Sequence, residues 1–439
     1  MEMLIDPRSD MISNLPDHVI ETILVHLPIR DAIRTCVLSH KWRYKWATIP
    51  ELVFEDYSIP PPFFDQNTIL TAQDVTIHVH KLVNFIDRVL LLHRGPVLKF
   101  KFKLSRYVVS DSCIDAWILF LSRNGVKELT LTIHYERLYK VSYAFFLCQA
   151  ITCLKLYFCI LEPPSMFKGF GDLKSLDLQS VSLSDEVLDT LISNCIALER
   201  LSLVQLRGCT RLKICGLNLQ HFYFDGELTD ICIIDAPQLS FVSIFSHDSL
   251  FKHVEQGDSC NLIKVLGPLT GLEKLATECF FLQFLAIGNL PARLPVTYDR
   301  LKCISLVINF DDLNETWSCY ACSKAPLIYR NLRLCVDATD DKYDVTELVE
   351  DFWQAQDHLD CSMNHLRVVR VCNISGAQPE LQFMKFLLVN SPLLEILTIT
   401  PKLDIIIDET KMMKELLRFR RTSAIAEIVY TPNLEDYMF

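Results

Sequence analysis

The sequence lacks the patterns that mark most catalytic and membrane-spanning proteins. It contains no glycine-rich loop ending in Lys-Ser or Lys-Thr, no His-Glu-x-x-His and no Gly-x-Ser-x-Gly. Those patterns are typical of nucleotide binding, zinc proteolysis and serine hydrolysis. The most apolar stretch, CFFLQFLAIGNL at 279–290, is too short to span a bilayer and contains Gln283. These absences predict a protein that is neither an enzyme nor embedded in a membrane, and the sequence indicates no cofactor.

An excess of positive charge is also missing. Lys and Arg number 43 against 54 Asp and Glu, which gives a formal net charge of -11. Binding to nucleic-acid phosphates or to an anionic membrane surface depends on an excess of Lys and Arg. The composition therefore argues against nucleic acid and against a membrane surface as partners.

The 17 cysteines show no disulfide framework. Their number is odd, and many lie inside apolar runs such as LCQAITCLKLYFC at 147–159, which is typical of buried, reduced thiols. The first residues, MEMLIDPRSD, carry no charged-then-apolar leader pattern. We therefore expect a soluble protein of the cytoplasm or the nucleus.

Two short motifs resemble parts of metal or redox sites. Cys319 and Cys322 form a C-x-x-C pair, but a structural zinc site needs a second pair, and a redox pair normally lies between a strand and a helix. His78 and His80 alternate without a third ligand nearby in the sequence. We expect no metal site at either place.

The first informative pattern lies in residues 13–52. Pro16 can occupy the first turn of a helix, and apolar residues at helical spacing follow it. Pro28 ends this helix and can open a second, while Ser39 is a good N-cap for a third that places Trp42 and Trp46 on one face. A three-helix unit of about 40 residues buries too little surface to be stable alone. Part of its apolar surface should therefore be covered by the rest of the chain or by another protein.

This segment resembles the F-box motif in its flowering-plant form. The similarity is carried by ISNLPD at 12–17, HLP at 26–28, VLS at 37–39 and the pair Trp42–Arg43, and it continues to Asp56. In that family the motif binds a Skp-type adaptor, which links it to the cullin and RING subunits of a ubiquitin ligase.

The resemblance implies the same binding here and assigns no catalytic residue to this chain. The implied contacts with the adaptor come from all three expected helices and from the residues that flank them. These residues are Leu15, Pro16, Ile20, Ile23, Leu24, Leu27, Pro28, Val37, Leu38, Ser39, Trp42 and Trp46.

The remaining nine-tenths of the chain carries an internal repeat. The frame apolar-x-x-apolar-x-apolar places its last two apolar residues on one face of a short strand. One such strand cannot bury its face alone, whereas a stack of strands encloses a continuous core. We therefore expect an irregular leucine-rich-repeat solenoid; the alternative, ordinary strands of an α/β domain, explains the many copies less well. The frame occurs at 97–102, 126–131, 151–156, 173–178, 198–203, 219–224, 239–244, 301–306, 329–334, 366–371 and 394–399, with a weaker copy at 272–277.

The connecting segments are expected to be helical in part. The join between the two patterns begins with a Pro-rich connector and ends in a helix expected from Val79 to His93, which would cover the open end of the solenoid. A helical return is expected at 184–197, where Ser184 is a suitable N-cap.

The C-terminal end differs from the frames before it. It contains an expected acidic helix at 341–361, a basic helix from Lys411 to Arg421 and a β-rich tail. We expect the charged runs to be solvated helix faces rather than binding patches. MNHLRVVRV at 363–371 and SPLLEILTI at 391–399 resemble the FBD region of plant F-box/LRR proteins.

Together these resemblances imply an α/β protein of the plant F-box/FBD/LRR-repeat family. A three-helix F-box motif would be followed by an irregular leucine-rich-repeat solenoid with an FBD-like α+β C-terminal end. The expected bounds are 8–56 for the F-box motif, 57–95 for the linker and capping helix, 96–340 for the solenoid, and 341–439 for the terminal repeats and the FBD-like region.

The implied function is that of a substrate-recognition adaptor in an SCF-type E3 ubiquitin ligase. The F-box motif would bind the Skp adaptor and the solenoid would bind a target protein, while other subunits transfer ubiquitin. Two alternatives stay open: a repeat scaffold that acts without a ligase, and a co-receptor for a small molecule. The exposed positions of the strand frames are the expected target surface. They are Lys174, Ser175, Asp177, Glu199, Arg200, Ser202, His221 and Tyr223.

Overall fold

The fold is that of a computed structural model of the 439-residue chain. The chain divides into two compact units, a first unit of residues 1–212 and a second unit of residues 213–439. Each unit contains its own run of parallel strands, called its strand ladder below. The structure describes residues 12, 15–56, 58, 71–104, 108–134, 136–227, 230–245, 269–278, 300–310, 329–336, 363–402 and 409–431.

The N-terminal segment, residues 15–56, starts with two short helices, α1 (Asp17–Val25) and α2 (Ile29–Arg34). Pro16 and Pro28 stand at the N-cap positions of these helices, where a residue without an N–H and with a fixed φ is well tolerated. Asp17 lies in the first turn of α1, where a carboxylate favours the positive end of the helix. The first two expected helices are confirmed.

The expected third helix is wrong. After η1 (Thr35–Val37) the backbone forms tight turns, with Trp42 N donating to Ser39 O at 3.2 Å and Lys45 N to Trp42 O at 3.3 Å. This i to i−3 pattern leads into a 3₁₀ helix, η2 (Lys45–Thr48). Ser39 is not a cap, because its Oγ is buried without a hydrogen-bond partner in the described part of the chain. Trp42 and Trp46 are nevertheless both buried.

The strand ladder of the first unit consists of short parallel strands in register. In each strand the second and fourth residues are buried while the others reach solvent in whole or in part. In every strand except β1 these buried positions are the last two apolar residues of the frame, so the expected strands are confirmed. The strands are β1 (Glu51–Glu55), β2 (Lys99–Lys103), β3 (Glu128–Thr132), β5 (Cys153–Tyr157), β7 (Ser175–Gln179) and β8 (Arg200–Val204).

Strand β1 was not expected from the repeat, since the first frame begins at residue 97. Leu52 and Phe54 are fully buried in β1, which pairs with β2 along its whole length. The end of the F-box-like segment therefore supplies the first strand of the ladder.

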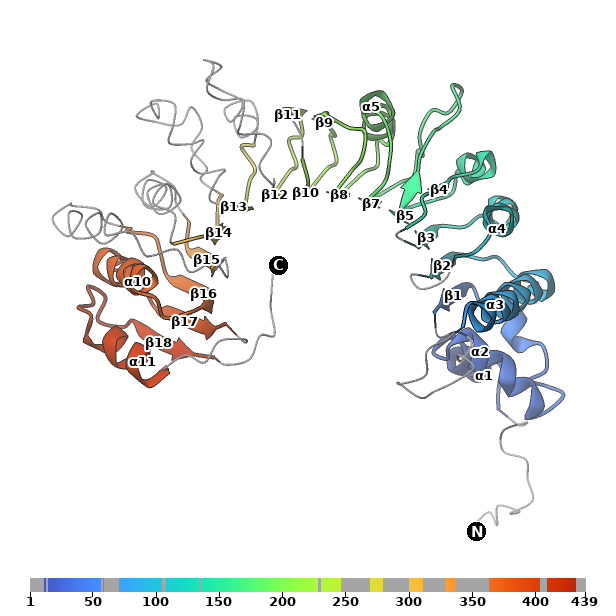
Figure 1. Cartoon of the computed structure of the whole chain (residues 1–439), viewed down its shortest axis with the longest axis horizontal. Coiled ribbons are helices and arrows are strands. Elements are labelled where there is room, and N and C mark those ends of the chain that lie inside the picture. Colours follow the sequence, from blue (N-terminus) through green and yellow to red (C-terminus); the bar gives the residue numbers. More distant parts are fainter. Residues whose placement is uncertain are drawn as a thin grey trace, which may run out of the picture. The chain divides into compact units, whose positions relative to one another are not determined.

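The helices of the first unit lie on the outer side of its strands (Figure 1). Helix α3 begins earlier than the expected Val79, because Thr71 and Asp74 cap each other: Asp74 N donates to Thr71 Oγ1 at 3.2 Å, and Thr71 N donates to Asp74 Oδ2 at 3.1 Å. Ser184 caps α5 as expected, accepting from Val187 N at 3.4 Å. The remaining elements of this unit are α3 (Ala72–Leu92), α4 (Asp111–Arg123), η3 (Tyr143–Leu147), α5 (Asp185–Asn194), β4 (Tyr139–Lys140) and β6 (Cys159–Ile160).

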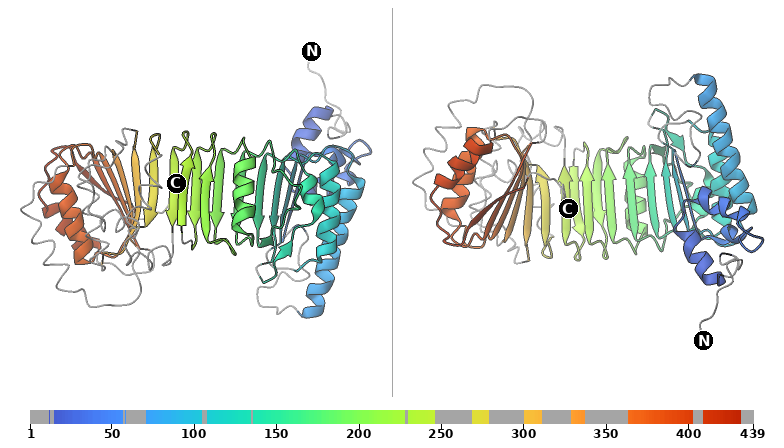
Figure 2. Two further views of the ribbon diagram at one scale, coloured as in Figure 1. Left: turned by 90° about the horizontal axis from the view of Figure 1, so that it is seen from above. Right: turned by 90° about the horizontal axis from the view of Figure 1, so that it is seen from below.

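The second unit has the same kind of ladder, and Figure 2 shows the strands of each unit side by side. Its paired strands are parallel, with a register shift only between Val371 and Ile374 among the described pairs. Every frame from 219 to 399, including the weaker copy at 272–277, lies on a strand. The strands of this ladder are β10 (His221–Asp225), β12 (Phe241–Phe245), β13 (Lys274–Glu278), β14 (Cys303–Ile308), β15 (Asn331–Val336), β16 (Val368–Ile374), β17 (Ile396–Pro401) and β18 (Glu427–Tyr430). Strands β9 (Arg211–Cys215), which begins in the first unit, and β11 (Asp230–Asp235) form a separate two-stranded sheet.

Two helices of the second unit flank its last strands, α10 (Gln378–Asn390) and α11 (Glu409–Arg418). Helix α11 corresponds to the expected basic helix, whereas α10 was not expected from the sequence. The buried carboxylate of Glu380 holds the start of α10, accepting from Gly376 N at 2.7 Å and from Ala377 N at 3.1 Å. Burial raises the pKa of Glu380, while these N–H groups oppose the shift.

Two expected features lie outside the described residues, the acidic helix at 341–361 and the pair Cys319 and Cys322. Within the part that the structure describes, no helix combines the length and the apolar character that crossing a bilayer requires.

Candidate functional site

The residues expected to contact an adaptor fall into two groups in the structure. One group is buried inside the N-terminal segment: Ile20, Leu24, Trp42 and Trp46. The indole Nε1 of Trp42 donates to the carbonyl oxygen of Ile12 at 3.2 Å. These four side chains hold the segment together and cannot themselves form an external surface.

The second group is open to solvent. Val37 is 87% exposed, Leu38 47% and Ile23 38%. Ile12 and Val25, which the sequence interpretation did not single out, are also exposed apolar residues. Of the other expected contact residues, Pro16 and Pro28 are exposed, and Leu15, Leu27 and Ser39 are half-buried.

Ion pairs fix α1 against the turns that follow α2. The Asp17 carboxylate lies 2.9 Å from Lys45 Nζ and 3.7 Å from Lys41 Nζ. The hydrogen bond from Lys45 is the largest influence that holds the pKa of Asp17 below its usual value. These contacts tie α1 to Lys41 and Lys45, while Val37 and Leu38 stay exposed.

The N-terminal segment is also bonded to the first turn of the ladder. Arg94 N donates to Ala47 O at 2.8 Å, and Leu98 N donates to Pro50 O at 2.8 Å. The guanidinium of Arg94 lies 5.2 Å from the centre of the Tyr44 ring, a cation–π contact. The segment is therefore partly covered by its own chain and partly open.

The expected target residues of the first unit come together on β7 and β8. Asp177 lies opposite Ser202 in the register, and Ser175 lies opposite Arg200. Asp177 accepts a hydrogen bond from Tyr157 OH at 2.8 Å, and Lys174 lies 3.3 Å from Glu199. Asp177 and Lys174 therefore each have a side-chain partner within the unit.

His221 and Tyr223 lie two residues apart on β10 in the second unit, both on the face away from the core. The Tyr223 ring lies 5.9 Å from the Phe245 ring on β12. Burial, followed by the charges of Asp225 and Glu278, raises the pKa of Tyr223. This part of the face is aromatic and acidic.

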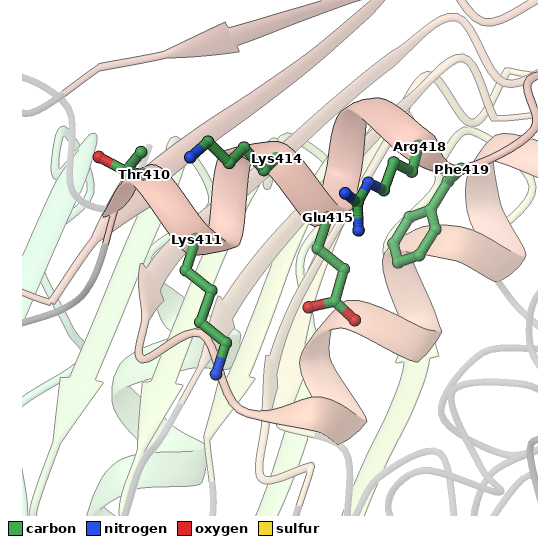
Figure 3. Close-up of a pocket in the computed structure, with 6 residues that line it drawn as sticks. All are labelled: Thr410, Lys411, Lys414, Glu415, Arg418 and Phe419. Atoms are coloured by element: carbon green, nitrogen blue, oxygen red, sulfur yellow. The ribbon is translucent and has the colours of Figure 1, made fainter.

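A cavity of about 570 Å³ lies beside α11 (Figure 3). The carboxylate of Glu415 in this cavity accepts a hydrogen bond from Gln378 Nε2 at 3.3 Å. The lining mixes charges of both signs with one aromatic ring. It consists of Thr410, Lys411, Lys414, Glu415, Arg418 and Phe419.

Burial shifts the pKa values of several described thiols and of one candidate ligand, His78. Burial raises the pKa of Cys148, Cys159 and Cys209 to about 12, so these thiols stay protonated near neutral pH. His78 is buried in α3, and burial lowers its pKa. The part of the chain covered by the structure contains no group of three or more His, Cys, Asp or Glu residues placed to hold a metal ion.

Three family models match separate stretches of the chain. An F-box domain model matches residues 12–53, a model described as "FBD-associated F-box protein At5g56370, LRR repeats" matches 114–319, and an FBD model matches 356–399.

Whole-chain comparisons point the same way. The chain is 38% identical over 424 residues to the F-box/FBD/LRR-repeat protein At1g13570 of Arabidopsis thaliana, a match that covers 96% of this chain and 98% of the relative. It is 27% identical over 473 residues to the FBD-associated F-box protein At1g66310 of the same plant, covering 97% of this chain and 96% of the relative.

Proposed function

The chain belongs to the F-box/FBD/LRR-repeat family of plant proteins, and on this premise we propose that it is the substrate-recognition adaptor of an SCF-type E3 ubiquitin ligase. The N-terminal segment binds a Skp-type adaptor, and through it the cullin and RING subunits. The strand ladders bind a target protein. The chain itself is non-catalytic and acts in the cytoplasm, the nucleus or both.

The observation that carries this proposal is the exposed apolar surface of the N-terminal segment. Ile23, Val37 and Leu38 are open to solvent, although Leu24, next to Ile23, and Trp42, four residues after Leu38, are buried. Apolar side chains that stay exposed on an internally fixed scaffold are typical of a surface that another protein covers. The F-box match at 12–53 supports a Skp-type adaptor as that protein.

The contribution of the chain to ubiquitin transfer is proximity. Holding a target and a charged carrier enzyme in one complex raises the effective concentration of target lysines near the reactive thioester. We take the ladders as turns of an irregular leucine-rich-repeat solenoid, with 96–340 as its bounds, followed by the FBD-like region. Their solvent-facing sides are the proposed target surface, since such a surface is where solenoids bind partners.

The test is co-expression with a plant Skp-type adaptor, followed by affinity purification and size-exclusion chromatography. We expect a one-to-one complex with the unmodified chain and a loss of affinity of at least about 100-fold for Val37→Asp/Leu38→Asp, because a carboxylate in an apolar interface is left unpaired. Leu91→Asp/Leu92→Asp is the matched control: Leu91 and Leu92 are 82% and 49% exposed on α3, against 87% and 47% for Val37 and Leu38.

Equal retention of the adaptor by both double variants would contradict the assignment of this surface. Failure of the unmodified chain to bind any Skp-type adaptor would overturn the ligase role. The N-terminal segment would then be a cap on the ladder, and the chain a repeat scaffold.

A further inference from the structure

Two arginines lie directly opposite each other on neighbouring strands of the second unit. Arg333 on β15 pairs with Arg370 on β16 in the parallel register (Figure 1). Both face away from the core, because the residues on either side of each are buried: Leu332 and Leu334 around Arg333, and Val369 and Val371 around Arg370. Neighbouring strands are about 4.8 Å apart, and like charges placed opposite each other at this spacing repel.

No counter-charge relieves this repulsion within the described chain. Neither the Arg333 side chain nor the Arg370 side chain makes an ion pair or a hydrogen bond with another described residue, and the Nε of Arg333 is buried without a hydrogen-bond partner. Two outward-facing cations of the first unit, in contrast, have acidic partners. Lys99 lies 3.3 Å from Glu51, and Lys101 lies 2.7 Å from Glu55. The opposed arginines therefore contrast with the paired lysines of the first ladder.

A hydroxyl side chain lies beside each arginine, on the strand that flanks it, and can donate a hydrogen bond. Ser305 on β14 lies opposite Arg333, and Thr398 on β17 lies opposite Arg370. These four residues, Ser305, Arg333, Arg370 and Thr398, are called the arginine row. The row thus combines two fixed positive charges with two hydroxyl groups.

The surrounding charges are also mainly positive. Burial raises the pKa of Cys303, while Arg333, Lys274 and Arg370 all act in the opposite direction, which places three cations around one thiol. The acids at outward positions within the described strands of this ladder are Asp225 and Glu278, which act on Tyr223, and Glu427 on β18. Glu273 and Glu395, just before β13 and β17, are ion-paired with Lys302 and Arg367. The outward acids within the strands thus lie towards β10 and β18, and the arginine row lies between them.

We propose, on the basis of the proposed function, that the arginine row binds a phosphorylated serine or threonine side chain of the target protein. A phosphate at neutral pH carries close to two negative charges and several acceptor oxygens. It matches two guanidinium groups, each able to donate two parallel hydrogen bonds, together with the flanking hydroxyls. A single carboxylate would neutralise only one of the two arginines. Recognition of the target would then depend on its phosphorylation.

The experiment measures capture by the full chain, in complex with its Skp-type adaptor, on two immobilised degenerate peptide libraries. One library has a fixed central phosphoserine or phosphothreonine, and the other has the unphosphorylated residue. We expect capture by the phosphorylated library only, and a loss of at least about 10-fold in Arg333→Gln/Arg370→Gln, since each charged bidentate contact is strong. Arg418→Gln/Arg420→Gln, at the C-terminal end of α11 and just beyond it, removes the same charge and is the control.

Each outcome of this experiment either locates the site that binds the phosphate or contradicts the proposal. Loss of capture in Arg418→Gln/Arg420→Gln, with capture intact in Arg333→Gln/Arg370→Gln, would place the anion site at the end of α11 and overturn the proposal. Equal capture by both libraries would overturn it as well. Competition by inorganic phosphate as strong as by a phosphopeptide would show that a free anion, rather than a target side chain, is the ligand.

Two further readouts keep the proposal independent of folding and of the ligase role. Arg370→Gln should raise the thermal stability of the unliganded chain, because it removes the opposed charge; a lower stability would indicate a structural role for the pair instead. Adaptor binding that survives while phosphopeptide capture fails in the unmodified chain would overturn the arginine row alone. Phosphopeptide capture by a chain that binds no adaptor would overturn the ligase role alone.

Discussion

The repeated apolar side chains of the strand ladders are buried, whereas several apolar side chains of the N-terminal segment are exposed to solvent. In the ladder of the first unit, Leu176 and Leu178 on β7 are closed off by the equivalent residues of β5 and β8. In the N-terminal segment, Leu24 and Trp42 are buried, but Val37 and Leu38 are left exposed. A repeated strand is completed by the next copy of itself. The helical segment occurs once, and under the proposed function a Skp-type adaptor covers its exposed side chains.

Two pairs of cations on the solvent-facing sides of the ladders differ in a second respect, their charged neighbours. Lys99 and Lys101 in the first unit have acidic partners on neighbouring strands. Arg333 and Arg370 in the second unit face each other. A surface whose charges are already paired gains little by binding an ion, while a surface with opposed like charges gains both a new contact and relief from repulsion.

The largest expected effect compares the same substitution in the two regions. Leu178→Asp places a carboxylate at a position with 0% exposure, and Leu38→Asp places one at 47% exposure. We expect Leu178→Asp to lower the free energy of unfolding by more than about 4 kcal/mol, and Leu38→Asp to change it by less than about 0.5 kcal/mol. Urea unfolding followed by circular dichroism measures both. Similar losses in the two variants would mean that Leu38 belongs to the core.

A smaller effect is expected from the ion pair that closes the N-terminal segment. Lys45 lowers the pKa of Asp17 below its unfolded value of 3.8, so the folded state favours the carboxylate. This stabilisation is complete above the unfolded pKa and is lost as the pH falls through the lower, folded-state pKa. The segment should therefore be more stable in the unmodified chain than in Asp17→Asn at neutral pH, and the difference should vanish in acid. Because Asp17 is solvated, salt should weaken the effect.

Tryptophan fluorescence during acid titration, at low and at high salt, measures this difference. Asp31→Asn is the control, since the ion pair of Asp31 with Arg34, at 3.8 Å, stays within one helix. A difference between Asp17→Asn and the unmodified chain that persists at the acid end would show that the side chain acts through packing rather than through its charge.

The strands could be predicted from the sequence because their signal is repeated. Each copy of the frame is weak evidence, but the copies from 97–102 to 394–399 recur along the chain, and each lies on a strand. Strand β1 was not predicted because the F-box resemblance already accounts for its apolar residues Leu52 and Phe54. Helix α10 was not predicted because it is apolar on most sides and therefore has no amphipathic period to detect.

The N-terminal segment was predicted less well for a different reason. Ser39 and the spacing of Trp42 and Trp46 suit a helix, yet isolated helices of this length are marginal, and tertiary packing selected tight turns instead. The division of the expected contact residues into buried and exposed groups could not be predicted either. Ile23 and Leu24 are adjacent and equally apolar in the sequence, but only the fold decides which of them faces the core.

The most direct test of the account is amide hydrogen exchange of the full chain with and without a plant Skp-type adaptor. Protection should rise in the N-terminal segment, most of all around Val37 and Leu38, while the amides of β2 to β8 stay as slow as before, since the ladder is already complete. An adaptor that leaves the exchange of residues 15–56 unchanged, or that slows the ladder strands equally, would contradict the claim that this segment is the part of the molecule that another protein completes.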